Sequence, residues 1–492
     1  MIKELENSNK INTNKVNPES GRRMYTAAVI NLGCKVNRYE ADSMRKIMAD
    51  SGIELVEPED IADFYIVNTC SVTNIAERKS RQMLRRAKRR NPEAIVIAAG
   101  CYVNAAHDEL LALDFVDAVI GNDRKCNIME VLGKYMTRDT MTDATANTQD
   151  NESNANEDLV NRHPFVYNSE NIDHKPDIYV KIDKSADFEE MGELTSSYLD
   201  HQRAYIKVQD GCNQFCSYCI IPYTRGRIRS RSPEKVVAEI SGLARSGVKE
   251  FVLTGIHISS YGRDFSVIEN NINYNNVRDL GDLICCVAKI PEVKRIRLGS
   301  LEPRIITKEF LDKISTIDKL CPHFHLSLQS ACNETLKRMN RKYTIEEYTE
   351  SCRMIREYFD RPAITTDVIV GFPGETEEEF GITLDNLKRL NLYEIHVFKY
   401  SVRRGTVAEK MPDQVPENIK NERSDILLEL TAGQKKDYET SLKGITDEVL
   451  VEEMINADND KCKMFTGYTK RYVKVQVEND NEIVGEIIPY TF

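Results

Sequence analysis

Three cysteines in one short loop constrain this 492-residue chain more than any other feature. The loop has the spacing Cys-x3-Cys-x2-Cys, and its cysteines are Cys212, Cys216 and Cys219. Alternating apolar residues at 204–208 predict a strand before the loop, and Ser232 followed by Pro233 predicts the start of a helix after it. The sequence therefore predicts that the three cysteines lie on a strand-to-helix loop.

The residue types in this loop point to an iron–sulfur cluster. Closely spaced thiolates without a partnering histidine are soft ligands that suit such clusters. Three thiolates bind three irons of a 4Fe-4S cluster and leave its fourth iron open to a small molecule. The alternative is zinc, which normally takes four ligands from paired Cys-x2-Cys units, so a lone triad fits it poorly. A disulfide fits the pattern less well still.

The spacing of the loop, with Tyr218 just before the last cysteine, resembles the signature of the radical S-adenosylmethionine (radical SAM) enzymes. This resemblance implies that S-adenosylmethionine (SAM) binds at the cluster held by Cys212, Cys216 and Cys219 and is reductively cleaved there. A reducing electron donor protein is then an expected partner.

Composition places the chain among cytoplasmic proteins of about three domains. The N-terminus is polar, and no run of 18 apolar residues occurs, so neither a signal peptide nor a membrane partner is predicted. Thirteen cysteines in such a chain indicate metal ligands and reduced thiols rather than disulfides.

The net charge of −11 is concentrated in one segment. Residues 141–200 contain 14 Asp and Glu but only four Lys and Arg, so the remaining chain is almost neutral. The same segment is poor in large apolar residues, which predicts an acidic linker or insertion at 137–200. The acidic total therefore does not exclude a nucleic-acid partner.

A doubly wound α/β domain is predicted at residues 24–136, after a disordered tail at 1–23. Helical patterns alternate with strand-like apolar runs, and the runs lie at 25–31, 64–68, 95–99 and 116–120. This alternation predicts a parallel sheet, whose ligands gather outside the carboxyl ends of the strands.

Each of the first three predicted strands ends in a cysteine, at Cys34, Cys70 and Cys101. Three successive strands that do so are hard to explain by packing alone. The segments GCKVNRYEAD, NTCSVTNIAERKSR and AAGC around these cysteines resemble the N-terminal domain of the methylthiotransferase family. In that family such cysteines hold a second, auxiliary iron–sulfur cluster, so the resemblance implies two 4Fe-4S clusters in this chain.

Residues 201–432 are predicted to form a partial (β/α)6 barrel, the fold of the radical SAM family. Short motifs follow the predicted strands, and the resemblance implies SAM contacts at Gly255, Glu302, Gln329 and Gly371. No acid–base catalytic residue is predicted. The strand histidines are interpreted as hydrogen-bonded core residues rather than ligands, namely His257, His323, His325 and His396.

Short strand patterns at 448–453, 472–477 and 483–488 predict a small all-β barrel at 433–492. Residues 465–472 resemble the TRAM domain, an RNA-binding barrel, and exposed Tyr468 and Tyr472 beside Lys and Arg suit base stacking. An ordinary barrel core is the alternative. The predicted helix at 74–90 carries eight Lys and Arg, which indicate either phosphate contacts or a solvated face.

The order of the three domains also matches the methylthiotransferase family. GCKVN and DGCNQFCSYCIIPYTRGRIRSR most resemble the branch that acts on tRNA threonylcarbamoyladenosine. This resemblance implies methylthiolation of carbon 2 of N6-threonylcarbamoyladenosine next to the anticodon, with tRNA and a sulfur source as partners. Three alternatives stay open: the same reaction on isopentenyladenosine in tRNA, methylthiolation of a ribosomal-protein aspartate, and an iron–sulfur RNA-binding protein without catalysis.

The two nucleosides differ in charge, because the threonylcarbamoyl group carries a carboxylate and the isopentenyl group is apolar. A cation near the reacting base is therefore expected for the first. The candidates are Lys35, Arg225 and Arg227, each of which is equally able to contact phosphate or solvent instead.

Overall fold

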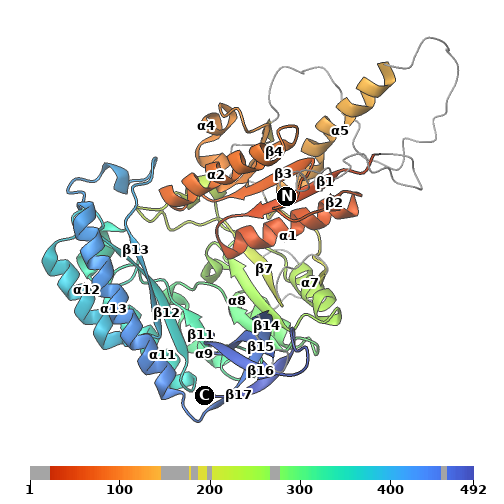
Figure 1. Cartoon of the computed structure of the whole chain (residues 1–492). Helices are drawn as coiled ribbons and strands as arrows, with labels where there is room; N and C mark the ends of the chain where they lie inside the picture. Colours follow the sequence, from red (N-terminus) through yellow and green to blue (C-terminus); the bar gives the residue numbers. More distant parts are fainter. Residues whose placement is uncertain (1–22, 146–176, 179–186, 197–201, 266–276, 456–462) are drawn as a thin grey trace, which may run out of the picture. The chain divides into compact units, whose positions relative to one another are not determined.

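The computed structural model describes residues 23–145, 177–178, 187–196, 202–265, 277–455 and 463–492. The chain divides into two compact units (Figure 1). The first contains Met1–Gly192 with Tyr223–Arg225, and the second contains Glu193–Pro222 with Gly226–Phe492. The tail predicted at 1–23, except Arg23, and most of the linker predicted at 137–200 lie outside the described residues.

The first unit is built on a six-stranded parallel sheet with the order β2-β1-β3-β4-β5-β6. Its strands are β1 (Thr26–Asn31), β2 (Glu54–Leu55), β3 (Phe64–Thr69), β4 (Ile95–Gly100), β5 (Ala118–Ile120) and β6 (Asp177–Ile178). Its helices are α1 (Lys35–Asp50), α2 (Asn74–Arg90), α3 (Cys101–Ala105), α4 (His107–Leu111) and α5 (Ile128–Thr145). The predicted parallel α/β sheet is confirmed.

Helices cover both faces of this sheet (Figure 1). Met44 of α1 and Val131 of α5 pack with Ile66 of β3 in one core. Leu84 of α2 packs in the other core with Tyr65, the strand neighbour of Ile66. Because successive strand residues point to opposite faces, an apolar run such as 64–67 supplies both cores at once.

Parts of the predicted linker belong to the first unit. Strand β6 pairs with β5, Met191 is 3% exposed in the core, and the Glu189 carboxylate accepts a hydrogen bond from the Cys126 amide at 2.9 Å. A two-residue edge strand and one buried methionine leave no periodic pattern, so the sequence did not indicate them.

The second unit contains six parallel strands in chain order. They are β7 (Arg203–Asp210), β9 (Glu250–Gly255), β10 (Arg295–Leu298), β11 (His323–His325), β12 (Ala363–Val370) and β13 (Glu394–Lys399). They form two hydrogen-bonded sheets, which the isolated parallel bridge between Leu301 and Leu326 connects. The predicted partial (β/α)6 barrel is confirmed, and the short β8 (Arg229–Ser230) adds antiparallel to β7.

Besides the short helix α6 (Ile221–Arg225), seven described helices lie between or after these strands: α7 (Pro233–Arg245), α8 (Leu280–Ala288), α9 (Lys308–Ile314), α10 (Asn333–Arg338), α11 (Ile345–Tyr358), α12 (Glu377–Leu390) and α13 (Glu417–Ser441). Local sequence fixes several of their starts. Thr344 with Glu347, and Thr376 with Glu379, form capping boxes at the starts of α11 and α12. Each box satisfies amide groups that the first helical turn leaves without partners.

A four-stranded antiparallel sheet ends the second unit, with the order β16-β15-β14-β17. Its strands are β14 (Thr446–Ile455), β15 (Lys463–Thr469), β16 (Lys474–Asn479) and β17 (Ile487–Thr491). Val449, Phe465 and Val475 pack in its core, in agreement with the predicted small β barrel. Within the described part of the chain, no helix has the length and apolar character needed to cross a membrane.

Candidate functional site

The cysteine triad of the first unit consists of Cys34, Cys70 and Cys101. The structure brings these three residues together at one edge of the unit's sheet. Cys34 precedes the first residue of α1, Cys70 directly follows β3, and Cys101 directly follows β4. A Cβ atom added at Gly33 would lie 3.0 Å from the Cβ atom of Cys70, so the first two loops approach closely. Burial raises the pKa of the Cys70 thiol to about 12. Metal binding here must therefore displace a proton.

A buried arginine contacts this triad. Arg225, from helix α6 (Ile221–Arg225), is 0% exposed and donates its Nε–H to the Cys101 sulfur at 3.2 Å. Its other guanidinium nitrogens donate to the Glu40 carboxylate at 2.8 Å and the Asn37 side-chain oxygen at 2.8 Å. Asn122 also donates to the Cys101 sulfur, at 3.4 Å. Arg225 thus faces neither solvent nor phosphate.

Sequence reasoning missed the partners of Arg225. Lys125 forms a second ion pair with Glu40, and both side chains are 0% exposed. Asn37 and Glu40 are three residues apart in α1, which was the one local signal that they share a helix face. Arg225 follows Glu40 by 185 residues and Asn37 by 188 in the sequence, and no local pattern reports such a distant contact.

The second cysteine triad lies in the second unit, in the loop that follows β7. The Cys219 amide donates to the Cys216 carbonyl at 2.9 Å, and the Gln214 amide donates to the Cys212 sulfur at 3.4 Å. Arg341 donates its Nη1–H to the Cys216 sulfur at 3.4 Å. Burial raises the pKa of Cys212 to about 11 and that of Cys219 to about 12.

Residues just after α10 hold this loop in place. The Ser217 amide donates to the Met339 carbonyl at 3.1 Å, and the Asn340 side chain donates to the Phe215 carbonyl at 2.8 Å. Phe215 has a φ of +50°, a conformation that non-glycine residues rarely adopt without such support. These partners were also missed, because they follow the loop by more than 120 residues.

The donor set of both triads fits a cluster better than a single ion. Structural zinc normally takes four ligands, whereas each triad supplies three thiolates. A 4Fe-4S cluster instead distributes its thiolates over different irons. The zinc alternative is therefore disfavoured for both sites.

The four predicted SAM-contact residues all follow barrel strands of the second unit. Gly255 ends β9, Gly371 directly follows β12, and Glu302 and Gln329 follow β10 and β11. The Glu302 side chain is 4% exposed; one carboxylate oxygen accepts from Arg304 at 2.6 Å, and the other has no hydrogen-bond partner among the described residues. A buried acceptor without a donor fits a ligand hydroxyl or ammonium group.

The two glycines have packing reasons that do not involve a ligand. A Cβ atom at Gly255 would lie 2.8 Å from the Gln209 side-chain oxygen, and one at Gly371 would lie 2.3 Å from the Lys420 side chain. Both positions therefore require glycine for protein contacts alone. Gln329 has a φ of +74°, which is unusual for a residue with a side chain. Contact of these residues with SAM stays a prediction.

Three of the four histidines agree with the predicted hydrogen-bonded or core positions. His257 lies beside the cysteine loop, where burial lowers its pKa to about 4 and its ring approaches Gln214 at 3.3 Å. His325 bonds the Thr365 hydroxyl at 2.9 Å, and His323 is buried against Tyr472. His396 differs, because it is exposed on β13, which is an edge strand of its sheet.

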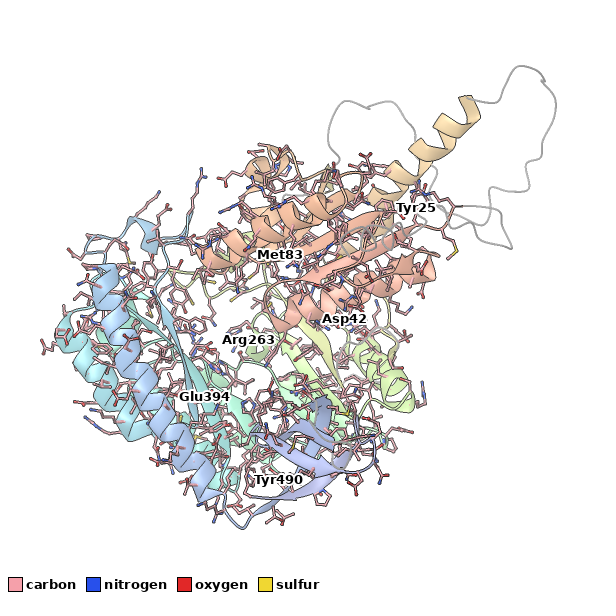
Figure 2. The ribbon with its side chains drawn as sticks, in the orientation of Figure 1. Tyr25, Asp42, Met83, Arg263, Glu394 and Tyr490 are labelled. Carbon is pink, nitrogen blue, oxygen red and sulfur yellow. The ribbon has the colours of Figure 1, made fainter. Side chains whose placement is uncertain are left out.

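Helix α2, on which Figure 2 labels Met83, presents exposed cations in the first unit. Lys88 pairs with Asp117 at 2.9 Å, and Arg85 lies over the Phe115 ring. Within the described residues, four other cations of α2 are exposed and form no ion pair: Arg78, Lys79, Arg86 and Arg89. A surface pocket is lined by Gln82, Arg85, Arg86, Arg89 and Arg90. These free cations define the α2 stripe, a surface suited to phosphate groups.

The aromatic residues of the TRAM-like segment, residues 465–472, contact other parts of the second unit. Tyr468 and Tyr472 stack on each other at 4.7 Å, and the Arg203 guanidinium lies over both rings. Arg471 pairs with Asp447 at 2.9 Å. The prediction that these tyrosines form an exposed stacking platform is wrong, because they join the C-terminal sheet to the barrel of the same unit.

A buried charge cluster strengthens this junction. Arg297 donates to the Lys470 carbonyl at 3.0 Å and, together with Arg295 and Arg203, pairs with Glu250, which is 0% exposed. Burial alone raises the pKa of Glu250, but the three guanidinium groups more than reverse this effect and lower it to about 2. The carboxylate is therefore ionised at any ordinary pH.

Two family matches cover the same regions as the two triads. The family described as "Radical SAM superfamily" matches residues 206–387, and "Uncharacterized protein family UPF0004" matches residues 26–121. Among solved structures, the radical S-adenosylmethionine methyltransferase TsrM from Kitasatospora setae is similar, with a TM-score of 0.50 and 15% identity over 76% of this chain and 75% of that chain. This likeness shows the fold alone.

Curated relatives are similar over nearly the whole chain. "Threonylcarbamoyladenosine tRNA methylthiotransferase MtaB" of Bacillus subtilis (strain 168) is 36% identical over 94% of this chain and 93% of its own. The protein with the same name in Aquifex aeolicus (strain VF5) is 38% identical over 86% and 92%. "tRNA-2-methylthio-N(6)-dimethylallyladenosine synthase" of Thermoanaerobacter pseudethanolicus is 32% identical over 98% and 93%.

The partial parallel barrel, with a three-cysteine loop after its first strand, defines a radical SAM enzyme. The chain belongs, within that class, to the methylthiotransferase family. The predicted family, the enzyme class, and SAM with iron–sulfur clusters as the family's cofactors are thereby confirmed.

Proposed function

We propose that this protein attaches a methylthio group to carbon 2 of N6-threonylcarbamoyladenosine next to the anticodon of tRNA. The observation that carries this proposal is the pair of cysteine triads, each placed where parallel strands end. The substrate assignment is supported by identities of 36% and 38% to two threonylcarbamoyladenosine enzymes; a third such enzyme is 32% identical, as is the dimethylallyladenosine enzyme named above. A tRNA substrate also implies a cytoplasmic location.

In this proposal each triad holds one 4Fe-4S cluster. Cys212, Cys216 and Cys219 bind the cluster at which SAM is cleaved, and Cys34, Cys70 and Cys101 bind the auxiliary cluster. When bound, these groups supply the electron for SAM cleavage and the sulfur to be transferred. An aromatic C–H bond offers no acidic proton to a general base, so the cofactors rather than acid–base side chains carry the bond-breaking chemistry.

The protein's own residues bind and orient these groups. The oxygen of Glu302 that has no partner among the described residues would accept a hydrogen bond from bound SAM. Arg341 and Arg225 direct N–H groups at Cys216 and Cys101, respectively. Such bonds to ligand sulfur atoms orient the thiolates and adjust the potential of a cluster. An electron donor protein and a sulfur source are required partners that stay predictions.

The α2 stripe contacts tRNA phosphates in this proposal. Its three free arginines and one free lysine lie on one exposed helix face and belong to the same unit as Cys34, Cys70 and Cys101. The C-terminal sheet contributes to RNA binding through a surface other than Tyr468 and Tyr472. That role rests on the resemblance to the TRAM domain.

Nucleoside analysis of bulk tRNA tests the substrate directly. Cells without this protein should lack 2-methylthio-N6-threonylcarbamoyladenosine and retain its unthiolated parent. The wild-type gene should restore the product, and a variant with all three cysteines of either triad replaced by Ala should not. A matched control replaces three other half-buried cysteines, Cys126, Cys285 and Cys286, and should restore it fully.

Other outcomes separate the alternatives. Loss of the isopentenyl product instead would refute the substrate assignment but keep the reaction. Loss of a methylthio group from a ribosomal aspartate, with tRNA unchanged, would refute the RNA substrate. An unchanged set of products, together with no SAM cleavage by the reduced protein, would leave an iron–sulfur RNA-binding protein.

A further inference from the structure

Two histidines and an aspartate converge on three adjacent strands of the second unit. His325 ends β11, Asp367 lies within β12, and His396 lies within β13. The parallel registers pair His325 with Thr365, and Asp367 with His396. Thr365 and Asp367 are two residues apart, so they share one face of β12. One ligand atom from each of the three side chains lies within 4.8 Å of the other two.

Hydrogen bonds around His325 match the pattern of a metal ligand. Its Nδ1 lies 2.9 Å from the Thr365 hydroxyl, and its Nε2 lies 3.2 Å from the Asp367 carboxylate. The tautomer with hydrogen on Nδ1 donates to Thr365 and leaves the Nε2 lone pair on the side of Asp367. Metal-binding histidines commonly donate their other ring N–H in this way.

The cluster is also open to ions from solvent. His325 is 8% exposed, the Asp367 side chain is 28% exposed, and His396 is exposed. The His325 and His396 rings lie 5.6 Å apart at their centroids and 25° from parallel, so the second imidazole covers one side of the first. Three ligands on one side and solvent on the other leave coordination positions for water or a small ligand.

We propose that His325, Asp367 and His396 bind one divalent transition-metal ion, at a third metal site that is separate from both cysteine triads. Two imidazoles with one carboxylate are a ligand set for Zn²⁺ or Fe²⁺ and contain no thiolate. Zn²⁺ binds such nitrogen and oxygen ligands more tightly than Fe²⁺ does, which makes it the better probe. The proposal is independent of the substrate proposed above.

A metal here would fasten the edge of the barrel. Strand β13, whose first residue Glu394 is labelled in Figure 2, pairs on one side with β12 within its three-stranded sheet. An ion shared by His325, Asp367 and His396 would add a bond from β13 to both other strands. Zinc should therefore slow hydrogen exchange in β13 and should do so only when His396 is present.

The test uses the full chain with both clusters reconstituted under anaerobic conditions, so that the cysteines are occupied. One equivalent of Zn²⁺ is added, unbound metal is removed, and zinc is counted separately from iron. The expected result is about one zinc per chain with nitrogen and oxygen neighbours at about 2.0–2.2 Å and no sulfur at about 2.3 Å in the X-ray absorption spectrum.

His396→Ala and Asp367→Asn should each weaken zinc binding at least about tenfold. His107→Ala is the matched control and should keep full binding, because His107 lies in the first unit beside Asp108. An unchanged iron content will show that the variants are folded and loaded. Three results would each overturn the proposal: no zinc uptake, sulfur neighbours around the zinc, or full binding by His396→Ala.

Discussion

Replacing Arg225 by Met should destabilise the first unit by about 3 kcal/mol and leave the second unit unchanged. Arg225 is 0% exposed and makes hydrogen bonds to Glu40, Asn37 and Cys101. Methionine has nearly the same length but no charge and no donor. The substitution therefore removes one partner of a buried ion pair without opening a large cavity.

The expected size follows from what remains after the substitution. Breaking a buried ion pair costs about 3–5 kcal/mol, because the other charge is left uncompensated. Here Glu40 keeps its ion pair with Lys125, so the lower end of that range applies. Arg225→Lys should cost about half as much, because an ammonium restores the charge but not the planar fork that reaches three partners.

Hydrogen exchange measured by mass spectrometry locates the effect. Peptides from β1, β3 and β4 report the first unit, and peptides from β12 serve as an internal reference in the second. A loss of 3 kcal/mol corresponds to about 150-fold faster exchange through global opening of the first unit. The protein should be reconstituted anaerobically, with its iron content measured beside each exchange experiment.

Arg227→Met is the matched control for this prediction. Arg227 is two residues further along the chain and exposed, with its guanidinium over the Phe215 ring at 5.3 Å. Its replacement should change stability by no more than about 1 kcal/mol. The reasoning fails if, at equal iron content, the amides of β1, β3 and β4 exchange as slowly in Arg225→Met as in the wild type. The buried pair of Arg225 and Glu40 would then have no stabilising role.

Three further predictions concern the clusters, the barrel junction and RNA. Reconstituted protein should contain about eight iron atoms per chain, and replacing all three cysteines of either triad by Ala should halve this number. Only the triple replacement of Cys212, Cys216 and Cys219 should abolish SAM cleavage. Full iron content in either triple variant would contradict the cluster site proposed at that triad. Glu250→Gln should destabilise the second unit by about 3 kcal/mol at pH 7. The lowered pKa of Glu250 in the wild type contributes stability that is complete above pH 4.5 and is lost as pH falls through about 2. Identical acid unfolding of the variant and the wild type would contradict this prediction. The double replacement Arg86→Glu with Arg89→Glu should weaken tRNA binding and reduce the slope of log K against log salt concentration by roughly one to two. The control Lys436→Glu on α13 should change neither quantity. Equal effects of the two changes would refute the α2 stripe as a specific RNA surface.

The positions of the six cysteines could be predicted because they depend on local pattern and simple topology. Apolar runs mark the strands, and parallel neighbours bring their carboxyl ends to one edge. Cys34, Cys70 and Cys101 meet there although more than 30 residues separate each from the next. The sequence cannot report which distant side chains complete the sites, as Arg341 and Glu40 show, because such pairs have no fixed spacing.

The error at Tyr468 and Tyr472 has a different cause. Aromatic residues beside Lys and Arg suit nucleic acid, but they suit a wet protein junction equally well. The deciding partners, Arg203 and Arg297, lie on barrel strands more than 170 residues earlier. The sequence correctly indicated that these tyrosines make aromatic stacking and cation contacts, but the partners are side chains of the same chain and not RNA. The same ambiguity does not affect α2, whose free cations are visible on the described surface.

In each triad one arginine donates a hydrogen bond to a cysteine sulfur, although the two triads lie in different folds of the same chain. Burial raises the pKa of Cys70 to about 12 and that of Cys219 to about 12, so the apoprotein favours neutral thiols. A bound cluster needs thiolates, and their negative charge must be balanced where water is scarce. Arg225 and Arg341 place a positive charge directly against the sulfur atoms of Cys101 and Cys216, respectively. Glu40 offsets Arg225 but is itself paired with Lys125, so this group of three retains one net positive charge beside Cys101. In the proposed arrangement the arginines would therefore serve the loaded protein, because bound thiolates would supply negative charge beside Arg225, which is buried, and Arg341, which is half-buried.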